Sequence, residues 1–439
     1  MLTEEQQHIF DGIIKRVHTH QGRTEAVIVG PAGTGKTFLV SNIVKELDRT
    51  GYSIAITSPT HKANAVIRKM VENIGVSEDD VQISTIHSFL GLKLVHEKNR
   101  QVLKLDQYNK PKGIVDVLLV DECSMISSDM YTYIQNQMNR VRRAIIFIGD
   151  SCQLPPVETE GTMDAAKLSP TFDIEMKFEL KTVMRQALDN PIIKVATAVR
   201  QCIGTRNDPM SYLRDVTGMD TIIPCNDDSV FLDTYRQYIE EYSKDVNSLY
   251  ETVLENRIVA YTNNRVNYAN MHIRNGLFPD FSEVEFIPGE PIVFESITEN
   301  CPYANQQIIK CPKLVPESFM GIDCWRMGDS SSSVLVVGPY SSLQLASHLD
   351  DLVKKIEGKK MNPISKRPYT WQDYYIIKNK INIVNYPYAT TAHKSQGSTF
   401  DHIWFDTNFI DRIPNNDTKC RIIYTALTRP RYQIILRNN

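Results

Sequence analysis

The chain has 439 residues, and 49 Lys and Arg against 52 Asp and Glu give a formal net charge of −3. At about 100 to 200 residues per domain, that length indicates about two to four domains. A hydrophobic content of 42% and a charged content of 23% are ordinary for globular proteins and exclude a disordered or fibrous chain. The near-neutral balance excludes a simple basic coat protein, although it permits a local basic channel.

The use of cysteine and the lengths of the apolar runs indicate the cellular compartment of the protein. The eight cysteines form no C-x-x-C pair, which favours a reduced, cytosolic protein without structural zinc. The first ten residues are polar and acidic, whereas a signal peptide needs a positive start and an apolar stretch, so we expect no export by that route. The longest apolar runs have four or five residues, and a membrane span needs about 20. We therefore expect no membrane association.

Over the first 150 residues, short apolar runs alternate with helical patterns, which predicts helices on both faces of a parallel sheet. Hydrophobic spacing predicts one helix that carries Phe38, Leu39, Ile43, Val44 and Leu47, and a second helix over 61–73. A polar, basic stretch at 92–113 interrupts the alternation and is expected to be an inserted loop or β-hairpin. The expected strands are 25–29, 52–57, 115–120 and 144–148.

A second α/β pattern begins near residue 185. It is interrupted by 277–379, where scattered β-type runs at 291–295 and 333–337 predict a β-rich insertion. The sequence therefore predicts an α/β protein with two nucleotide-binding-type domains, 1–184 and 185–439. The expected elements of the second are strands 257–262, 381–384, 402–405 and 432–436, and helices 263–274 and 421–427.

The strongest chemical signal matches the phosphate-binding pattern G-x-x-x-x-G-K-[ST] and lies between a predicted strand and a predicted helix. Glycines let backbone N–H groups curl around phosphate oxygens, and the following helix directs its positive end at them. Lys36 is expected to reach the β- and γ-phosphates of ATP, and Thr37 to hold Mg²⁺. The loop consists of Gly30, Pro31, Ala32, Gly33, Thr34, Gly35, Lys36 and Thr37.

Two further polar groups follow buried strands. Asp121 and Glu122 end the strand at 115–120, so we expect Asp121 to bind Mg²⁺ and Glu122 to polarise the attacking water. Gln153 follows the strand at 144–148 and could place its amide near the γ-phosphate, beside the Pro155-Pro156 turn. Taken alone, Gly149-Asp150 and Pro155-Pro156 are equally consistent with ordinary turns.

Together these pieces belong to a series that resembles a superfamily 1 helicase, and more closely the superfamily 1B branch of RecD-like and Dda-like enzymes. Such a helicase has two RecA-like P-loop domains. The matches follow the family's order along the chain: LTEEQ at 2–6 resembles the adenine-reading motif, SPTHKA at 58–63 motif Ia, STIHS at 84–88 motif Ib, VMRQ at 183–186 motif IV, TAHKSQG at 391–397 motif V and YTALTR at 424–429 motif VI.

The resemblance implies roles for the matching residues. Gln6 would recognise the adenine edge, while Arg185 and Arg429 would approach the γ-phosphate from the second domain as arginine fingers. Small hydroxyls and imidazoles at strand-to-helix junctions suit phosphate contacts that form and break at each step, although helix capping is the plainer interpretation for each Thr. The residues implied to contact the nucleic acid are Thr60, His61, Thr85, His87, Thr391, His393 and Gln396.

The two insertions depart from the family pattern. The segment 93–113 occupies the place of the family's duplex-splitting β-hairpin, domain 1B, but Tyr108 is its only aromatic residue. The insertion 277–379 matches the family's SH3-like domain, 2B, only in location and β-rich character. Its stretch 367–375 mixes cations with aromatic residues, as a strand-binding surface would, but packing of a small core is the favoured explanation.

The implied function is an ATP-dependent DNA helicase that uses ATP and Mg²⁺, translocates on single-stranded DNA from 5′ to 3′, and unwinds duplexes in phage replication or recombination. The implied partners are single-stranded DNA, a DNA fork and a single-strand-binding protein, for a monomer in the host cytoplasm. Three alternatives remain: a single-strand translocase or protein-displacing ATPase without strong unwinding, an RNA-directed motor, and a P-loop phosphotransferase or regulatory NTP-binding protein. Stimulation of the ATPase by DNA, RNA or neither discriminates the last two.

Overall fold

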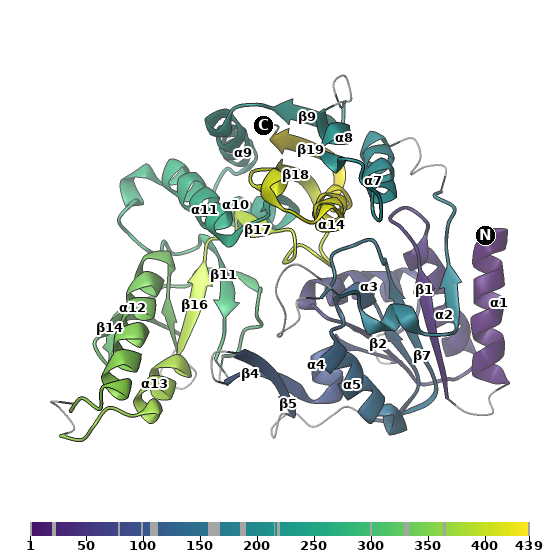
Figure 1. The fold of residues 1–439 in the computed structure, drawn as a ribbon, viewed down its shortest axis with the longest axis horizontal. Coiled ribbons are helices and arrows are strands. Elements are labelled where there is room, and N and C mark those ends of the chain that lie inside the picture. Colours follow the sequence, from purple (N-terminus) through teal and green to yellow (C-terminus); the bar gives the residue numbers. More distant parts are fainter. Residues whose placement is uncertain are drawn as a thin grey trace. The chain divides into compact units, whose positions relative to one another are not determined.

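The computed structural model contains two compact units, whose elements Figure 1 labels. The first comprises Met1–Pro224, Ser395–Thr399 and Phe409–Ile434, and the second comprises Cys225–Lys394, Phe400–Asn408 and Ile435–Asn439. The domain boundary predicted after residue 184 stays a prediction. The structure describes residues 2–19, 23–77, 80–97, 100–105, 113–156, 167–184, 190–214, 216, 220–298, 301–328, 333–362 and 366–437.

A six-stranded sheet forms the centre of the first unit. All its pairings are parallel, as the alternating pattern predicted. The sheet gains β3 and β8, which the sequence pattern did not predict. In spatial order its strands are β3 (Val81–Thr85), β2 (Ile54–Ser58), β6 (Val115–Val120), β7 (Val141–Gly149), β1 (Thr24–Val29) and β8 (Lys177–Glu179).

Both faces of this sheet are buried, because alternate residues of each strand enter different cores. In β6, Val117 and Leu119 pack against α1, α2 and α3, while Leu118 and Val120 pack against α4 and α5. Buried parallel strands are accordingly almost continuously apolar. The helices of the unit are α1 (Glu4–His18), α2 (Lys36–Arg49), α3 (His61–Asn73), α4 (Ile86–Leu90), α5 (Ser128–Asn136), α7 (Pro191–Gln201), α8 (Pro209–Arg214) and α14 (Asn416–Leu427).

The interruption after motif Ib contains a β-hairpin, as predicted. Its strands β4 (Leu92–Glu97) and β5 (Arg100–Leu105) pair antiparallel, from Leu92 opposite Leu105 to Glu97 opposite Arg100. The Tyr133 hydroxyl donates to the Leu103 carbonyl oxygen over 2.8 Å, and Leu103 packs against the core beneath α4 and α5. The hairpin is thus anchored at its base to the first unit.

A five-stranded sheet has the order β17-β10-β18-β19-β9. Its strand nearest the end of the sequence is β19 (Pro430–Arg437). β10 (Asn256–Ala260) lies between β17 (Ala389–Thr391) and β18 (Phe400–Asp406) in parallel pairings. The remaining elements around this sheet are β9 (Ile222–Cys225), α9 (Asp228–Tyr242), α10 (Val246–Glu255) and α11 (Asn263–Leu277).

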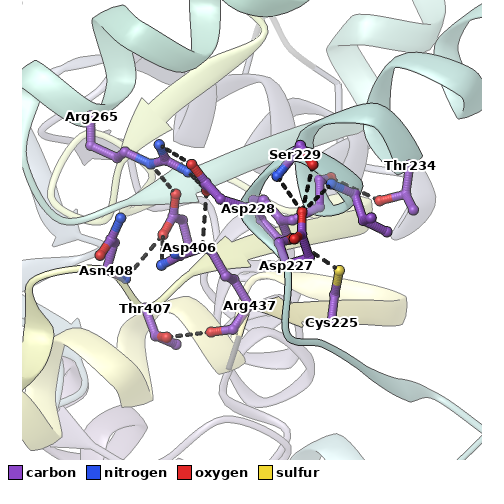
Figure 2. A network of polar contacts seen from close by, with 12 residues as sticks. Cys225, Asp227, Asp228, Ser229, Thr234, Arg265, Asp406, Thr407, Asn408 and Arg437 are labelled. Carbon is purple, nitrogen blue, oxygen red and sulfur yellow. Dashed lines mark hydrogen bonds and ion pairs between the residues drawn. The ribbon is translucent and has the colours of Figure 1, made fainter. Parts of the chain in front are cut away.

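A network of two arginines and two aspartates ties the ends of four elements of the second unit together (Figure 2). Arg265, at the start of α11, donates to Asp228 of α9 and to Asp406 of β18. Arg437 of β19 lies 3.0 Å from Asp228 (Nε to Oδ1) and 3.7 Å from Asp406 (Nη1 to Oδ1). Asp406 is fully buried and Arg265 is 7% exposed, so each buried charge has an opposite partner, as burial requires.

The predicted β-rich insertion forms a separate six-stranded sheet. Only the β15–β16 pair is parallel among its pairings. It is not purely β, because a 19-residue helix, α12 (Pro339–Glu357), and α13 (Trp371–Lys378) pack on it (Figure 1). Its strands in order are β12 (Ile308–Lys310), β11 (Pro291–Ser296), β16 (Ile381–Asn385), β15 (Val334–Val337), β14 (Ile322–Met327) and β13 (Val315–Phe319).

The assignment of strand 381–384 to the second α/β sheet was wrong. β16 instead pairs with β11 and β15, so it closes the insertion. In the aromatic stretch, Tyr374 is 9% exposed in the core under α12, whereas Trp371 is 48% exposed. Packing therefore accounts for Tyr374, and a surface role stays open for Trp371.

Across the described ranges, no helix combines the length and the apolar character needed to cross a bilayer.

Short 3₁₀ helices connect the larger elements at η1 (Cys123–Met125), η2 (Met138–Arg140), η3 (Pro170–Asp173), η4 (Pro279–Phe281) and η5 (Ile410–Arg412).

Candidate active site

The glycine-rich loop turns directly from β1 into α2, as the sequence predicted. Gly33 and Gly35 adopt left-handed backbone angles, with φ of 81° and 77°, a region that residues with a Cβ rarely enter. Gly35 caps α2, so the positive end of that helix points into the loop. The Lys36 ammonium group donates to the carbonyl oxygens of Gly30 and Pro31 over 2.7 and 3.0 Å. The loop and Lys36 thus form a cationic, N–H-rich cradle suited to phosphate oxygens.

Both ends of the Gln6 side-chain amide make hydrogen bonds, one to the start of α1 and one to this loop. Its Oε1 accepts from the Thr3 N–H over 3.1 Å, which completes a capping box at the start of α1. Its Nε2 donates to the Thr34 carbonyl oxygen over 3.1 Å. A Cβ added at Gly35 would lie 2.6 Å from Gln6 Nε2, so the glycine allows this close approach.

The acidic pair ends β6 beside the loop. The Asp121 N–H donates to the Thr57 carbonyl oxygen over 2.8 Å, and Asp121 Oδ1 accepts from the Glu122 N–H over 2.9 Å. Burial, followed by the charge of Glu122, raises the pKa of Asp121 to about 7. A bound divalent cation would stabilise the negative charges of the two carboxylates. Glu122 has a left-handed φ of 51°, an uncommon conformation for a residue with a side chain.

The donor set fits Mg²⁺ held jointly with a nucleotide. Within the described ranges, no cluster of three or more His, Cys, Asp or Glu side chains is arranged to hold a metal alone. Mg²⁺ bound by one or two protein oxygens and by substrate phosphates needs no such cluster. Thr37 and Asp121 stay the predicted protein ligands, and the exposed Thr37 at the start of α2 is accessible to a ligand.

Gln153 lies in the loop that follows β7. Its side chain is 6% exposed, and its Oε1 has no hydrogen-bond partner among the described residues. An unpaired buried amide oxygen is costly, and a site that positions a water or a phosphate-linked group would satisfy it. The loop backbone itself is held, because Arg421 Nη1 donates to the Gln153 carbonyl oxygen over 3.1 Å and also to that of Ser151.

The two predicted arginine fingers have different outcomes. Arg185 lies outside the described residues. Arg429 is 5% exposed and donates to the carbonyl oxygens of Thr425 and Ser398 over 3.1 and 3.2 Å. In this structure its guanidinium group therefore joins motif VI to motif V, and its role as an arginine finger stays a prediction.

The threonines predicted to contact nucleic acid cap turns or helices. Thr60 Oγ1 accepts from the Ala63 N–H at the start of α3, Thr85 Oγ1 from the Ser88 N–H at the start of α4, and Thr391 Oγ1 from the Lys394 N–H, each over 3.2 Å. The helix-capping interpretation is thus confirmed for Thr60 and Thr85, whereas Thr391 caps a turn. Capping leaves each hydroxyl proton able to donate outward, so a phosphate contact remains a prediction.

The other residues predicted to contact nucleic acid lie in different surroundings. His87 is half-buried in α4, and burial lowers the pKa of His393. The side chain of His61 lies outside the described set. Gln396 is buried and donates from Nε2 to the Leu154 carbonyl oxygen over 2.8 Å, so it contacts the loop of Gln153 directly.

Two functional positions were missed by sequence reasoning. Gly397 has φ of 67°, and a Cβ there would lie 3.1 Å from Thr60 Oγ1 and 3.7 Å from Glu122 Cγ. Motif V thus approaches motif Ia and the acidic pair. The second is Tyr424, whose hydroxyl reaches the phosphate loop. A glycine after a polar turn is a signal for Gly397, whereas no local pattern predicts the contact of Tyr424.

Comparisons with known proteins agree with this geometry. A family model described as an AAA domain matches residues 1–207, and one described as a UvrD-like helicase C-terminal domain matches residues 386–436. The ATP-dependent DNA helicase dda of Enterobacteria phage T4 is 27% identical, over 99% of this chain and 98% of that protein. The RecBCD enzyme subunit RecD of Haemophilus influenzae is 30% identical over 30% of this chain and 22% of its own length.

The fold has its own counterpart. A solved structure that describes DNA unwinding at forked dsDNA by two coordinating Pif1 helicases matches with a TM-score of 0.50 and 16% identity, over 100% of this chain and 92% of that one. That likeness supports two RecA-like α/β sheets with a hairpin insertion and a β-rich insertion. With the motifs in family order, the full-length similarity to dda supports the resemblance to the superfamily 1B helicases and to their branch that contains Dda and RecD.

Proposed function

We propose that the protein is an ATP-dependent DNA helicase that translocates on single-stranded DNA from 5′ to 3′ and separates duplexes. One observation carries the proposal. The phosphate loop, the acidic pair and Gln153 occur in the same compact unit as the capping threonines of motifs Ia and Ib and the buried residues of motifs V and VI. The nucleotide site and the predicted strand contacts of motifs Ia and Ib therefore lie in one compact unit.

The residues around the loop divide the chemistry among themselves. Lys36 and the N–H groups of the loop would bind the phosphates, and Thr37 and Asp121 would hold Mg²⁺, which neutralises charge that builds on the transferred phosphoryl group. Glu122 would orient the attacking water and accept its proton. The buried Oε1 of Gln153, which has no partner in the described part of the chain, would position that water from the other side.

The strand track is supported by the way the threonines cap. Because Thr60 and Thr85 accept N–H groups at the starts of α3 and α4, each hydroxyl still has a proton that it can donate to a phosphate oxygen. Positive helix ends favour the same anion. Such contacts fix the strand's register without reading its sequence, as a motor that steps along any sequence requires.

The finer assignments rest on the similarity to the T4 helicase over both full lengths. From it we propose the 5′ to 3′ direction, a role in phage replication or recombination within the host cytoplasm, action as a monomer, and cooperation with a single-strand-binding protein. The hairpin β4–β5 occupies the place of the duplex-splitting element, which supports unwinding over translocation alone.

The test uses partial DNA duplexes that carry a single-stranded tail on either the 5′ or the 3′ side, with ATP and Mg²⁺. Lys36→Ala is the control, since loss of the phosphate-binding ammonium should reduce turnover by about a hundredfold or more. We expect opening of the 5′-tailed duplex alone. Opening of the 3′-tailed duplex alone would contradict the direction, and stimulation of ATPase activity by single strands without opening of either would favour a translocase. Matched RNA strands distinguish an RNA-directed motor, and an ATPase indifferent to both polymers would overturn the proposal.

A further inference from the structure

We propose that Tyr424 is a positioning residue that couples the phosphate loop to the loop carrying Gln153 and, through it, to motif V. The inference rests on the proposed function, because a coupling element is useful only to an enzyme in which ATP turnover responds to a bound strand. Tyr424 lies in α14 and is 1% exposed. It is not one of the residues to which the resemblance gave a role.

The Tyr424 hydroxyl makes two hydrogen bonds of opposite sense. It donates to Asp150 Oδ2 over 2.5 Å, and it accepts from the Ala32 N–H over 3.1 Å. A phenol has one proton, so donation to the carboxylate fixes the direction in which the oxygen faces the phosphate loop. Burial raises the pKa of Tyr424 well above its ordinary value, so the hydroxyl keeps its proton over the working pH range.

Asp150 makes this contact specific. Its side chain is 1% exposed, and its other oxygen, Oδ1, accepts from the Cys152 N–H over 3.0 Å. The guanidinium group of Arg200 is close enough to interact electrostatically with both Asp150 and Tyr424. A buried carboxylate requires donors on its oxygens, so the direction of Asp150 depends on the hydroxyl of Tyr424. Asp150 begins the loop that presents Gln153.

The same helix grips that loop at two further points. Thr425 Oγ1 accepts from the Leu154 N–H over 3.1 Å, and Arg421 donates to the Gln153 carbonyl oxygen over 3.1 Å. On the far side of the loop, Gln396 of motif V donates to the Leu154 carbonyl oxygen over 2.8 Å. A continuous series of hydrogen bonds therefore runs from Ala32 through Tyr424 and the Gln153 loop to motif V.

This series of hydrogen bonds would let Tyr424 transmit a change from the phosphate loop to the Gln153 loop. The Ala32 N–H belongs to the loop that would bind the phosphates, so a change in that loop alters the hydrogen bond that Tyr424 accepts. Because Tyr424 and Thr425 move with one helix, the change also reaches Asp150 and Leu154. Spatial continuity alone does not establish coupling, so the inference is tested by its energetic signature.

The test compares Tyr424→Phe with wild type and with Tyr212→Phe, the same chemical change at an exposed site in α8. Phenylalanine keeps the buried ring and removes both hydrogen bonds. We expect the strand-stimulated kcat for ATP to fall about tenfold, the scale set by losing a hydrogen bond to a charged group, while KM for ATP and the affinity for single-stranded DNA change less than about threefold. Tyr212→Phe should behave as wild type.

A second variant separates coupling from loss of fold. Asp150→Asn retains a carbonyl oxygen that can accept from Tyr424, so its kcat should fall less than that of Tyr424→Phe. In the double variant the two losses should not add, because Asp150→Asn weakens the same hydrogen bond that Tyr424→Phe removes. Equal kcat in Tyr424→Phe and wild type would overturn the inference, as would strict additivity in the double variant. Failure of single strands to stimulate the wild-type enzyme would instead overturn the proposed function.

Discussion

Gln6 Nε2 donates to the Thr34 carbonyl oxygen over 3.1 Å, so the first helix of the chain is bonded to the phosphate loop 28 residues later. The other end of the same amide accepts from the Thr3 N–H and completes the cap of α1. One buried side chain therefore orders the helix start and fixes the backbone on one side of the nucleotide site.

Replacing Gln6 by alanine should therefore weaken ATP binding and destabilise α1 together. We expect KM for ATP to rise several-fold and the free energy of unfolding to fall by about 1 kcal/mol, as for loss of a helix cap. Gln7→Ala is the matched control, because the Gln7 side chain donates to the exposed Asp11 on its own helix and not to the phosphate loop. ATPase kinetics and thermal unfolding check both variants, and an unchanged KM in Gln6→Ala would remove Gln6 from the nucleotide site.

Glu122→Gln should separate binding from hydrolysis. The amide keeps the size of the side chain at a left-handed position but cannot accept a proton from water, so kcat should fall by about a hundredfold or more. Nucleotide affinity, measured by titration of a fluorescent ATP analogue, should stay within about threefold of wild type. Asp129→Asn, an exposed carboxylate change in α5, serves as the control. Retention of normal turnover by Glu122→Gln would exclude it as the base.

Local pattern predicted those features that depend on neighbours in sequence. The phosphate loop and the strand before the acidic pair follow from periodicity and glycine placement within short windows. After motif Ib the pattern breaks, which left a loop and a β-hairpin as alternatives. β6 coincides with its predicted bounds of 115–120, and α3 with 61–73.

Features set by tertiary pairing could not be predicted in this way. β16 has the same apolar pattern whichever sheet it joins, and only its pairing with β11 and β15 assigns it to the insertion. The contact of Tyr424 with Ala32 spans 392 residues. Hydrophobic periodicity, which describes short windows, cannot predict a contact over that separation. Arg429 matched its motif, yet its present partners, Thr425 and Ser398, depend on the path of motif V.

Stability should depend on pH through Glu290, a fully buried carboxyl whose Oε2 lies 3.4 Å from Arg274 Nε. Burial outweighs the opposing effect of Arg274 and raises the pKa of Glu290 from 4.5 to about 7. The folded state thus binds this proton more tightly than the unfolded chain. The resulting stabilisation is complete below about pH 4.5 and is lost as the pH rises through 7.

Glu290→Gln removes that titration, so its free energy of unfolding should decline less between pH 5 and pH 8 than that of wild type, by about 1 kcal/mol or more. Urea unfolding at several pH values measures the slope. An identical slope in both proteins would contradict the raised pKa.

The arginine network of Figure 2 should be far more sensitive than a surface ion pair. Arg265→Met leaves the fully buried Asp406 with the more distant Arg437 as its cationic partner among the described residues, so we expect a loss of about 3 to 5 kcal/mol in unfolding free energy. Arg236→Met is the control, since Arg236 is more exposed and pairs with the exposed Asp233 and Glu240, and should cost about 1 kcal/mol or less. Equal losses would mean that the buried network contributes no more than a surface pair.

Gly397→Ala should impair the enzyme through contact and not through backbone strain alone. Both Gly397 and Gly75 have left-handed φ, 67° and 74°, but a Cβ at Gly75 would meet no atom within 4 Å, while one at Gly397 would lie 3.1 Å from Thr60 Oγ1 and 3.3 Å from Ala63 Cβ. Gly75→Ala therefore reports the conformational cost alone, about 1 kcal/mol. We expect Gly397→Ala to lose a similar or larger amount of stability. Unlike Gly75→Ala, it should also lose strand-stimulated ATPase activity about tenfold or more, because motif V is displaced from Thr60 and Glu122.

Measuring the stimulation by single strands at saturating ATP, with the unfolding free energy as the reference, separates the loss of activity from the loss of stability. Equal activities in the two variants would show that the approach of motif V to motif Ia is not needed for stimulation.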